Sequence, residues 1–213
     1  MMNGGGCAIP ELTAIRESMQ GEIQSRLDEF RRIRERGDAE EVFVELVFCL
    51  LTPQSKARVC WAAVQSLLEK NLLFDGTIDQ ISGELHGVRF KYRKAEYIVK
   101  ARDMRDQLAE ISRFNDACDA REWLVQNVLG IGYKEASHFM RNIGYGESLA
   151  ILDRHILKNL KLLGVVEEIP KSLSKKTYLE IEKGMRELAE ESGISMSQLD
   201  LVLWCKETGE VFK

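Results

Sequence analysis

The sequence contains little proline and no long apolar run. Only 3 of its 213 residues are proline, and apolar residues seldom alternate with polar ones, so the chain favours helices over strands. No stretch approaches the roughly 18 uninterrupted apolar residues that indicate a transmembrane helix, and we therefore expect no membrane contact. The start, from Met1 to Cys7, lacks the charged and then apolar pattern of a secretion signal, and we interpret it as a flexible leader.

Clustered cysteines are also absent. No CxxC pair and no Cys/His ligand spacing occurs among the 5 cysteines, so neither a zinc nor an iron–sulfur site is expected. An odd number of scattered thiols is typical of a reducing compartment, and we expect a cytoplasmic protein. The cysteines are Cys7, Cys49, Cys60, Cys118 and Cys205.

The chain has no excess of positive charge. Its 30 Lys and Arg against 34 Asp and Glu give a net charge of −4, which argues against a simple basic DNA-binding protein. A local basic cluster at residues 89–94 is followed by Lys100 and Arg102. This cluster fits either a solvated helix face or a surface that follows a phosphate backbone.

Apolar residues recur every three or four positions through most of the chain and predict an all-α fold. The segment 42–51 is apolar on nearly every side, with Glu45 as its one charge, and predicts a helix in the centre of a bundle. Ser197-Gln198-Leu199-Asp200 fits a capping box and predicts the start of the last helix. The other expected helices span 12–33 (closed by Gly37), 57–68, 92–108, 120–129, 134–142, 154–163 and 174–192.

A turn rich in glycine joins the apolar segments 123–129 and 136–140 and predicts a helix-hairpin-helix. Gly130 and Gly132 expose backbone N–H groups at the start of a helix, where a DNA phosphate can bind. Directly behind them, Lys134 carries an amine that could act as a nucleophile. Most lysines at such positions are solvated charges or nonspecific phosphate contacts, and this alternative stays open.

A carboxylate follows at Asp153, which lies 153 − 134 = 19 positions after Lys134. An apolar run brings it to the start of a new helix, where an aspartate is often an ordinary N-cap. A carboxylate can also stabilise the positive charge that develops at C1′ of a sugar when a glycosidic bond breaks. The two roles are compatible because a cap holds the carboxylate in place.

Residues 125–156 resemble the signature of helix-hairpin-helix DNA glycosylases that carry a lysine and an aspartate in the active site. The resemblance rests on the Gly-Ile-Gly-Tyr-Lys turn at 130–134 and on the Leu-Asp-Arg-His step at 152–155. Within that superfamily the chain is similar to the short archaeal-type 8-oxoguanine DNA glycosylase/AP lyase family, over roughly residues 35–213. The short chain, its end in Val211-Phe212-Lys213 and the lack of a four-cysteine loop support this narrower assignment.

The resemblance implies two lobes with a cleft between them. A central six-helix lobe would span about 37–147, with its helix-hairpin-helix at 123–142. The N-terminal helix, within 1–36, would pack with the C-terminal lobe at 148–213. Lys134 would attack C1′ as a neutral amine, release the base and leave a Schiff base, and β-elimination would then nick the strand. No metal and no organic cofactor is implied.

Base recognition is implied at four further positions. Lys213 would enter the base pocket, where the carboxylate of the chain end would read the edge of guanine, unless the tail is simply frayed. Trp204 and Phe90 are candidates for stacking on the flipped base, and the resemblance favours Trp204, although either aromatic could instead belong to the core. Gln54 would fill the gap left in the duplex, or would be an ordinary surface glutamine.

The expected partner is double-stranded DNA containing 8-oxoguanine, bound by a monomer. Two other functions remain open. An endonuclease III-like glycosylase for oxidised pyrimidines would not need Lys213. A noncatalytic helix-hairpin-helix DNA-binding module would need neither Lys134 nor Asp153, so their combination argues against it. His138 and His155 lie near the motif and are treated as structural.

Overall fold

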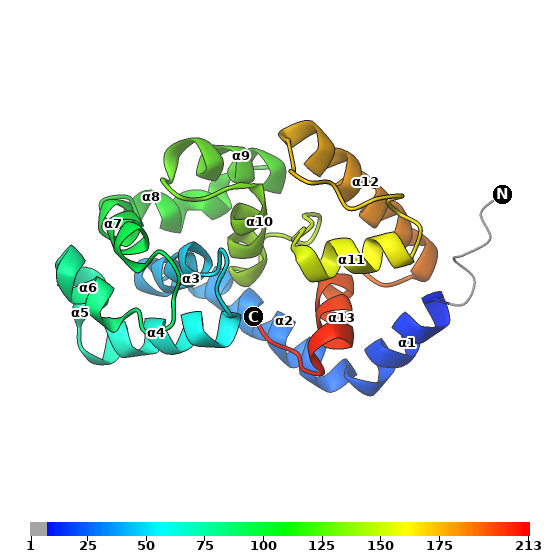
Figure 1. Ribbon diagram of the computed structural model, residues 1–213, viewed down its shortest axis with the longest axis horizontal. Coiled ribbons are helices and arrows are strands. Elements are labelled where there is room, and N and C mark those ends of the chain that lie inside the picture. Colours follow the sequence, from blue (N-terminus) through cyan, green and yellow to red (C-terminus); the bar gives the residue numbers. More distant parts are fainter. Residues whose placement is uncertain (1–7) are drawn as a thin grey trace.

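The computed structural model describes residues 8–213, and within that range the chain forms helices and loops without a β-strand (Figure 1). The predicted all-α class is confirmed. Residues 1–7, with the expected flexible leader and Cys7, lie outside the described residues. The helices are α1 (Ala8–Ser18), α2 (Gln20–Arg36), α3 (Ala39–Leu51), α4 (Ala57–Glu69), α5 (Leu72–Asp75), α6 (Ile78–Glu84), α7 (Lys91–Arg102), α8 (Arg105–Ala109), the 3-10 helix η2 (Glu110–Arg113), α9 (Ala117–Asn127), α10 (Tyr133–Asn142), α11 (Arg154–Leu162), α12 (Lys175–Ser192) and α13 (Met196–Thr208).

The buried apolar side chains form two clusters. The first is built around α3, which is buried along nearly its whole length, and takes in residues from Val42 to Leu149 together with Phe212. The second joins α1 and α2 to α11, α12 and α13. The two groups of helices lie side by side, and the C-terminal end of the chain lies between them (Figure 1). The first group also contains the short helices α5 and α6, which lie between residues 68 and 92, where the sequence predicted no helix.

Three predicted helix boundaries are wrong. The single helix expected at 12–33 is divided at Met19, because α1 packs on α13 whereas α2 contacts both α13 and α10. The helix expected at 92–108 is likewise divided into α7 and α8, the second of which packs on α3. The last helix is capped by Ser195, which accepts a hydrogen bond from the Gln198 N–H, and not by Ser197. A Ser-x-x-Gln capping pattern is present at 195–198, two residues before the predicted one.

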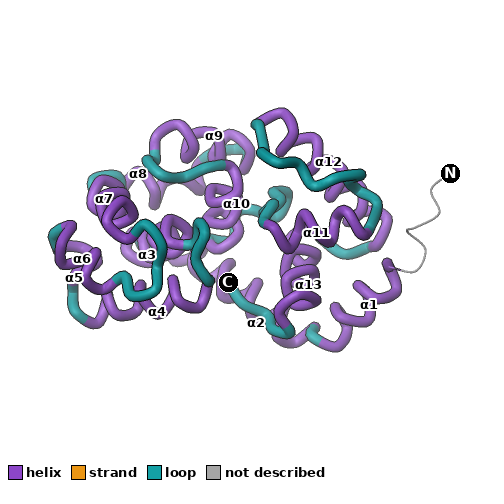
Figure 2. Tube along the Cα trace, in the orientation of Figure 1, coloured by secondary structure: helices purple, strands orange, loops and turns teal. Residues whose placement is uncertain are grey.

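Most connections between the helices are short, as the loops in Figure 2 show. Two segments are longer: residues 163–174 join α11 to α12, and residues 143–153 lead from α10 in the first group to α11 in the second. The segment 143–153 bears on the site. It carries Asp153 at its end, so whatever fixes this segment also fixes that carboxylate. Between residues 8 and 213, no helix has the length and apolarity needed to cross a membrane.

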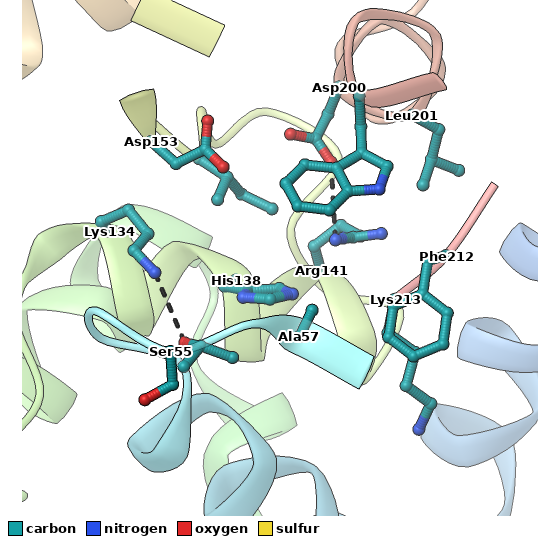
Figure 3. A pocket seen from close by; sticks show the side chains of 13 residues that line it. Ser55, Ala57, Lys134, His138, Arg141, Asp153, Asp200, Leu201, Phe212 and Lys213 are labelled. Atoms are coloured by element: carbon teal, nitrogen blue, oxygen red, sulfur yellow. Dashed lines mark hydrogen bonds and ion pairs between the residues drawn. The ribbon is translucent and has the colours of Figure 1, made fainter. Parts of the chain in front are cut away.

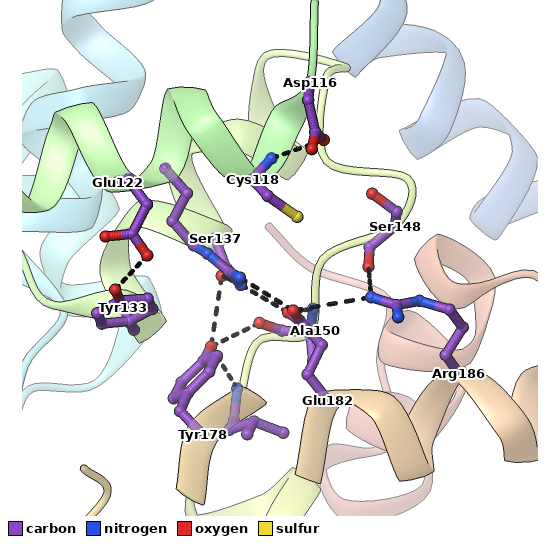
Figure 4. A network of polar contacts seen from close by, with 12 residues as sticks. Asp116, Cys118, Glu122, Tyr133, Ser137, Ser148, Ala150, Tyr178, Glu182 and Arg186 are labelled. Atoms are coloured by element: carbon purple, nitrogen blue, oxygen red, sulfur yellow. Dashed lines mark hydrogen bonds and ion pairs between the residues drawn. The ribbon is translucent and has the colours of Figure 1, made fainter. Parts of the chain in front are cut away.

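A buried ion pair fixes the 143–153 segment (Figure 4). Arg121 of α9 donates from Nη1 and Nη2 to the two carboxylate oxygens of Glu182 on α12, at 2.6 and 2.9 Å. The same carboxylate accepts the Ala150 N–H at 2.8 Å, and the Tyr178 hydroxyl donates to the Ala150 carbonyl at 2.6 Å. The network therefore ties both groups of helices to the backbone three residues before Asp153.

Candidate active site

The helix-hairpin-helix consists of α9, the turn at residues 128–132, and α10. Gly130 adopts a φ of +89°, and a Cβ atom there would lie 2.2 Å from the Tyr97 ring, so only glycine fits. Gly132 is the N-cap of α10 in extended conformation. The turn is thus narrow and presents the amino end of α10, as a phosphate site requires.

Lys134 lies in the first turn of α10 and is partly buried, with 23% of its side chain exposed. Its Nζ contacts Glu135 Oε1 at 3.1 Å and donates to Thr52 Oγ1 at 3.4 Å. Thr52 is the C-cap of α3, so the amine reaches from the hairpin to the central helix of the first group. A partly buried amine at the wall of a pocket can reach a substrate without leaving its helix.

Asp153 is the N-cap of α11, as one of the two sequence interpretations predicted. Its Oδ1 accepts the N–H groups of His155 and Ile156, each at 2.8 Å, whereas Oδ2 takes part in neither bond. The positive end of the helix dipole stabilises a carboxylate at this place. The cap therefore holds one oxygen rigidly and leaves the second available for an electrostatic role.

Lys134 and Asp153 line the same pocket, although they come from different helix groups (Figure 3). In this view they lie at one side of the pocket, and Phe212 and Lys213 lie at the other. Trp204 of α13 also lines it. The remaining lining residues are Thr52, Ser55, Ala57, His138, Arg141, Ile151, Asp200 and Leu201.

Two buried side chains of opposite charge, Arg141 and Asp200, line this pocket. Arg141 Nη2 lies 3.5 Å from Asp200 Oδ2, and both side chains are less than one-tenth exposed. Burial raises the pKa of Asp200 to about 6, although Arg141 opposes the shift. Burial, with the positive charges of Arg141 and Lys134, lowers the pKa of His138 well below its usual value, so its ring is neutral at pH 7.

Several polar atoms around the pocket have no protein partner. Among the described residues, these include Trp204 Nε1, Arg141 Nη1 and both ring nitrogens of His138. Because buried donors rarely stay unsatisfied, the pocket suits a polar ligand that offers acceptors. A purine base has such acceptors at its ring nitrogens, and guanine has a further one at its carbonyl oxygen.

A family profile described as 8-oxoguanine DNA glycosylase matches residues 23–194. The chain belongs to the 8-oxoguanine DNA glycosylase family. The 8-oxoguanine DNA glycosylase/AP lyase of Fusobacterium nucleatum is 44% identical over 209 residues, which are 95% of this chain and 96% of the relative.

Two solved structures of relatives are similar over nearly the whole chain. The crystal structure of the 8-oxoguanine DNA glycosylase of Thermotoga maritima has a TM-score of 0.90 and 38% identity, over 97% of this chain and 98% of that one. The Methanocaldococcus jannaschii 8-oxoguanine glycosylase/lyase, in complex with 15mer DNA containing 8-oxoguanine, has a TM-score of 0.90 and 37% identity, over 97% and 99%. The helix-hairpin-helix fold predicted from the sequence is therefore confirmed.

The structure does not bring Phe90 or Gln54 into the pocket described above. Phe90 precedes α7 and is 56% exposed, with the Arg89 guanidinium 5.3 Å from its ring centre. Gln54 is exposed in the loop after α3. Both adopt positive φ, at +58° and +55°, which is uncommon for residues other than glycine and marks strained backbone.

One buried lysine links the loops that carry these two residues. Lys94 Nζ donates to the carbonyls of Leu51 and Pro53, both at 2.7 Å, and to Ser55 Oγ at 3.2 Å. Ser55 Oγ in turn accepts the Arg89 N–H at 3.0 Å. Lys94 therefore fixes the loop after α3, whose first residue, Thr52, contacts Lys134. Through Ser55 it also fixes the loop that ends at Phe90.

Lys94 should make stability depend on pH. Burial lowers the pKa of Lys94 to about 8 from 10.5. Between these values the unfolded chain holds the extra proton, so stability rises with pH there. We expect the free energy of unfolding of the wild type, relative to Lys94→Met, to rise by about 1–3 kcal/mol across this range. Denaturant unfolding at several pH values measures it, and a flat difference would contradict the prediction.

Sequence reasoning missed several residues of the pocket. Arg141 and Asp200 pair across 59 positions of sequence (200 − 141 = 59), and Asp200 was interpreted as part of a helix cap. The sequence did contain a signal for Asp200 in α13 and for Glu45 in α3, because each is a charged residue among apolar ones and therefore needs a partner. Lys94 was counted with the solvated or phosphate-binding cluster, whereas it is 3% exposed and binds carbonyls.

Proposed function

We propose that the protein excises 8-oxoguanine from double-stranded DNA and then nicks the abasic site by β-elimination. The observation that carries this proposal is the convergence of Lys134 and Asp153 on one pocket in a chain of this family. We further propose that it acts as a monomer on DNA in the cytoplasm.

In the proposed reaction, the neutral amine of Lys134 attacks C1′ of the damaged nucleotide. The C1′–N9 bond breaks, the base leaves with a proton, and the sugar ring opens to a Schiff base with Lys134. Asp153 stabilises the positive charge that develops at C1′, because its carboxylate is already held at the end of α11. Loss of a C2′ proton then expels the 3′ phosphate and leaves a nicked strand.

The proposal also assigns the recognition of the flipped base. Trp204 supplies a stacking surface inside the pocket, and Lys213 brings the end of the 213-residue chain to the same pocket. Phe90 would complete the stack from the other side once DNA is bound, since its ring is exposed and the N–H of the preceding residue, Arg89, donates to Ser55, which lines the pocket. Gln54 would enter the duplex in place of the base. Gly130 and Gly132 would hold a phosphate.

Borohydride trapping tests this function, since it reduces the Schiff base to a stable amine and fixes the enzyme to DNA. We expect an adduct with a duplex containing 8-oxoguanine opposite cytosine, an adduct with an abasic site, and none with undamaged guanine. An adduct with an oxidised pyrimidine instead would keep the mechanism and overturn the proposed substrate. Absence of any adduct, including that with the abasic site, would favour a noncatalytic DNA-binding module.

A further inference from the structure

We propose that Glu45 is a positioning residue that anchors Lys213, and that excision of the base depends on this anchor whereas nicking of an abasic site does not. Glu45 lies in the middle of α3, the central helix of the first group, and Lys213 lines the pocket. This inference rests on the proposed role of Lys213 in recognising the base.

The first support is the ion pair itself. Lys213 Nζ contacts Glu45 Oε1, although 168 positions separate the two residues. The side chain of Glu45 is 3% exposed and that of Lys213 is 11% exposed, so water screens the pair little. The second carboxylate oxygen of Glu45 accepts a hydrogen bond from Asn142 Nδ2 at 2.8 Å, which fixes the orientation of the carboxylate.

Aromatic side chains complete a cage around the ammonium group. Lys213 Nζ lies 3.6 Å from the centre of the Trp61 ring and 5.8 Å from that of Phe48. The faces of aromatic rings attract cations, most strongly where water is excluded. The site therefore recognises a lysine ammonium group by charge, by a hydrogen-bonded carboxylate and by ring faces.

Phe212, the residue before Lys213, also holds the end of the chain against the first group of helices. Phe212 is buried in the first core, although the helix before it belongs to the second, and its ring centre lies 6.4 Å from that of Phe48. The tail is therefore held at two side chains, and the frayed tail that the sequence left open does not occur.

Base excision and nicking of an abasic site should therefore depend on different residues of the pocket. The chemistry at C1′ belongs to Lys134 and Asp153, and among the described residues neither forms a hydrogen bond or ion pair with Glu45 or Lys213. An abasic site has no base to recognise, so nicking of an abasic site should not depend on the anchor. Excision of 8-oxoguanine should depend on it, because misplacement of a recognition group by about 1 Å can cost two orders of magnitude in rate.

The test compares two activities of Glu45→Gln, which keeps the shape of the side chain and removes its charge. We expect single-turnover excision of 8-oxoguanine to fall ~10- to 100-fold and nicking of an abasic duplex to change less than ~2-fold. Glu210→Gln is the matched control, because Glu210 tethers the same tail through an exposed pair with Arg58. Its excision rate should change less than ~3-fold.

Two further variants connect the effect to Lys213. The double variant Glu45→Gln/Lys213→Met should excise 8-oxoguanine no more slowly than Lys213→Met alone, since the anchor then has nothing to hold. It also leaves no unpaired buried charge, so it remains informative if Glu45→Gln is poorly folded. Equal losses of excision and nicking in Glu45→Gln, or additive losses in the double variant, would overturn the proposal.

A last measurement does not depend on the substrate. Carboxypeptidase B removes lysine from a chain end, and intact mass reports the loss. Lys213 of the 213-residue chain should be released ~10-fold faster from Glu45→Gln than from wild type, because the anchored tail is a poor substrate. Equal release would overturn the anchor even if 8-oxoguanine is excised. Lack of 8-oxoguanine excision by the wild type, with faster release from the variant, would overturn only the proposed function.

Discussion

The variant Lys134→Gln should form no borohydride adduct and should nick abasic DNA at least ~10³-fold more slowly than wild type. The amine is the group proposed to bond to C1′, and an amide nitrogen cannot form the Schiff base on which β-elimination depends. The change keeps a polar side chain of similar length at the start of α10. Binding of DNA should therefore change little, because the hairpin glycines and the amino end of the helix remain.

The control for this variant is Lys176→Gln, which removes one positive charge from an exposed site on α12, outside the pocket. It should retain full adduct formation and the wild-type nicking rate. Single-turnover nicking and a fluorescence binding titration on the same abasic duplex separate chemistry from affinity. An adduct that persists in Lys134→Gln would contradict the assignment and would direct the search to another amine, such as that of Lys94.

The parts of the fold that the sequence predicted are those that depend on local pattern. Helix periodicity placed α4 and α12, since each has an apolar face that repeats along its own length, and a continuous apolar run placed α3. The division of the first helix at Met19 was not predictable in this way, because it depends on two different packing partners. The start of α13 was misplaced because Ser195 and Ser197, two positions apart, each begin a pattern that fits a helix cap.

The same distinction between local pattern and distant packing applies to the residues of the candidate site. Lys134 and Asp153 each stand at a helix start marked by glycine or by a capping aspartate, so nearby residues were enough to suggest them. Glu45 and Arg141 acquire their partners only when distant segments meet, as the 168 positions between Glu45 and Lys213 illustrate. The charge of Glu45 within an apolar helix indicated that it has a partner, but it did not show which residue that partner is.

The variant Glu182→Ala should lower the free energy of unfolding by about 3–5 kcal/mol, the usual cost of leaving one partner of a buried ion pair uncompensated. The side chains of Arg121 and Glu182 are 1% and 3% exposed, so neither solvent nor salt can replace the lost charge. The Ala150 N–H also loses its acceptor. Because this backbone leads directly to Asp153, the rate of base excision should also fall, even at temperatures where the variant is folded.

Thermal and denaturant unfolding measure the effect, with Glu187→Ala as the matched control on the same helix. Glu187 is exposed and lies 3.7 Å from Lys183, so its loss should cost less than about 0.5 kcal/mol. The double variant Arg121→Met/Glu182→Leu should be more stable than Glu182→Ala, because apolar side chains can replace a buried pair when both charges are removed. A double variant no more stable than Glu182→Ala would show that the hydrogen bond to Ala150, and not the charge left on Arg121, carries most of the cost.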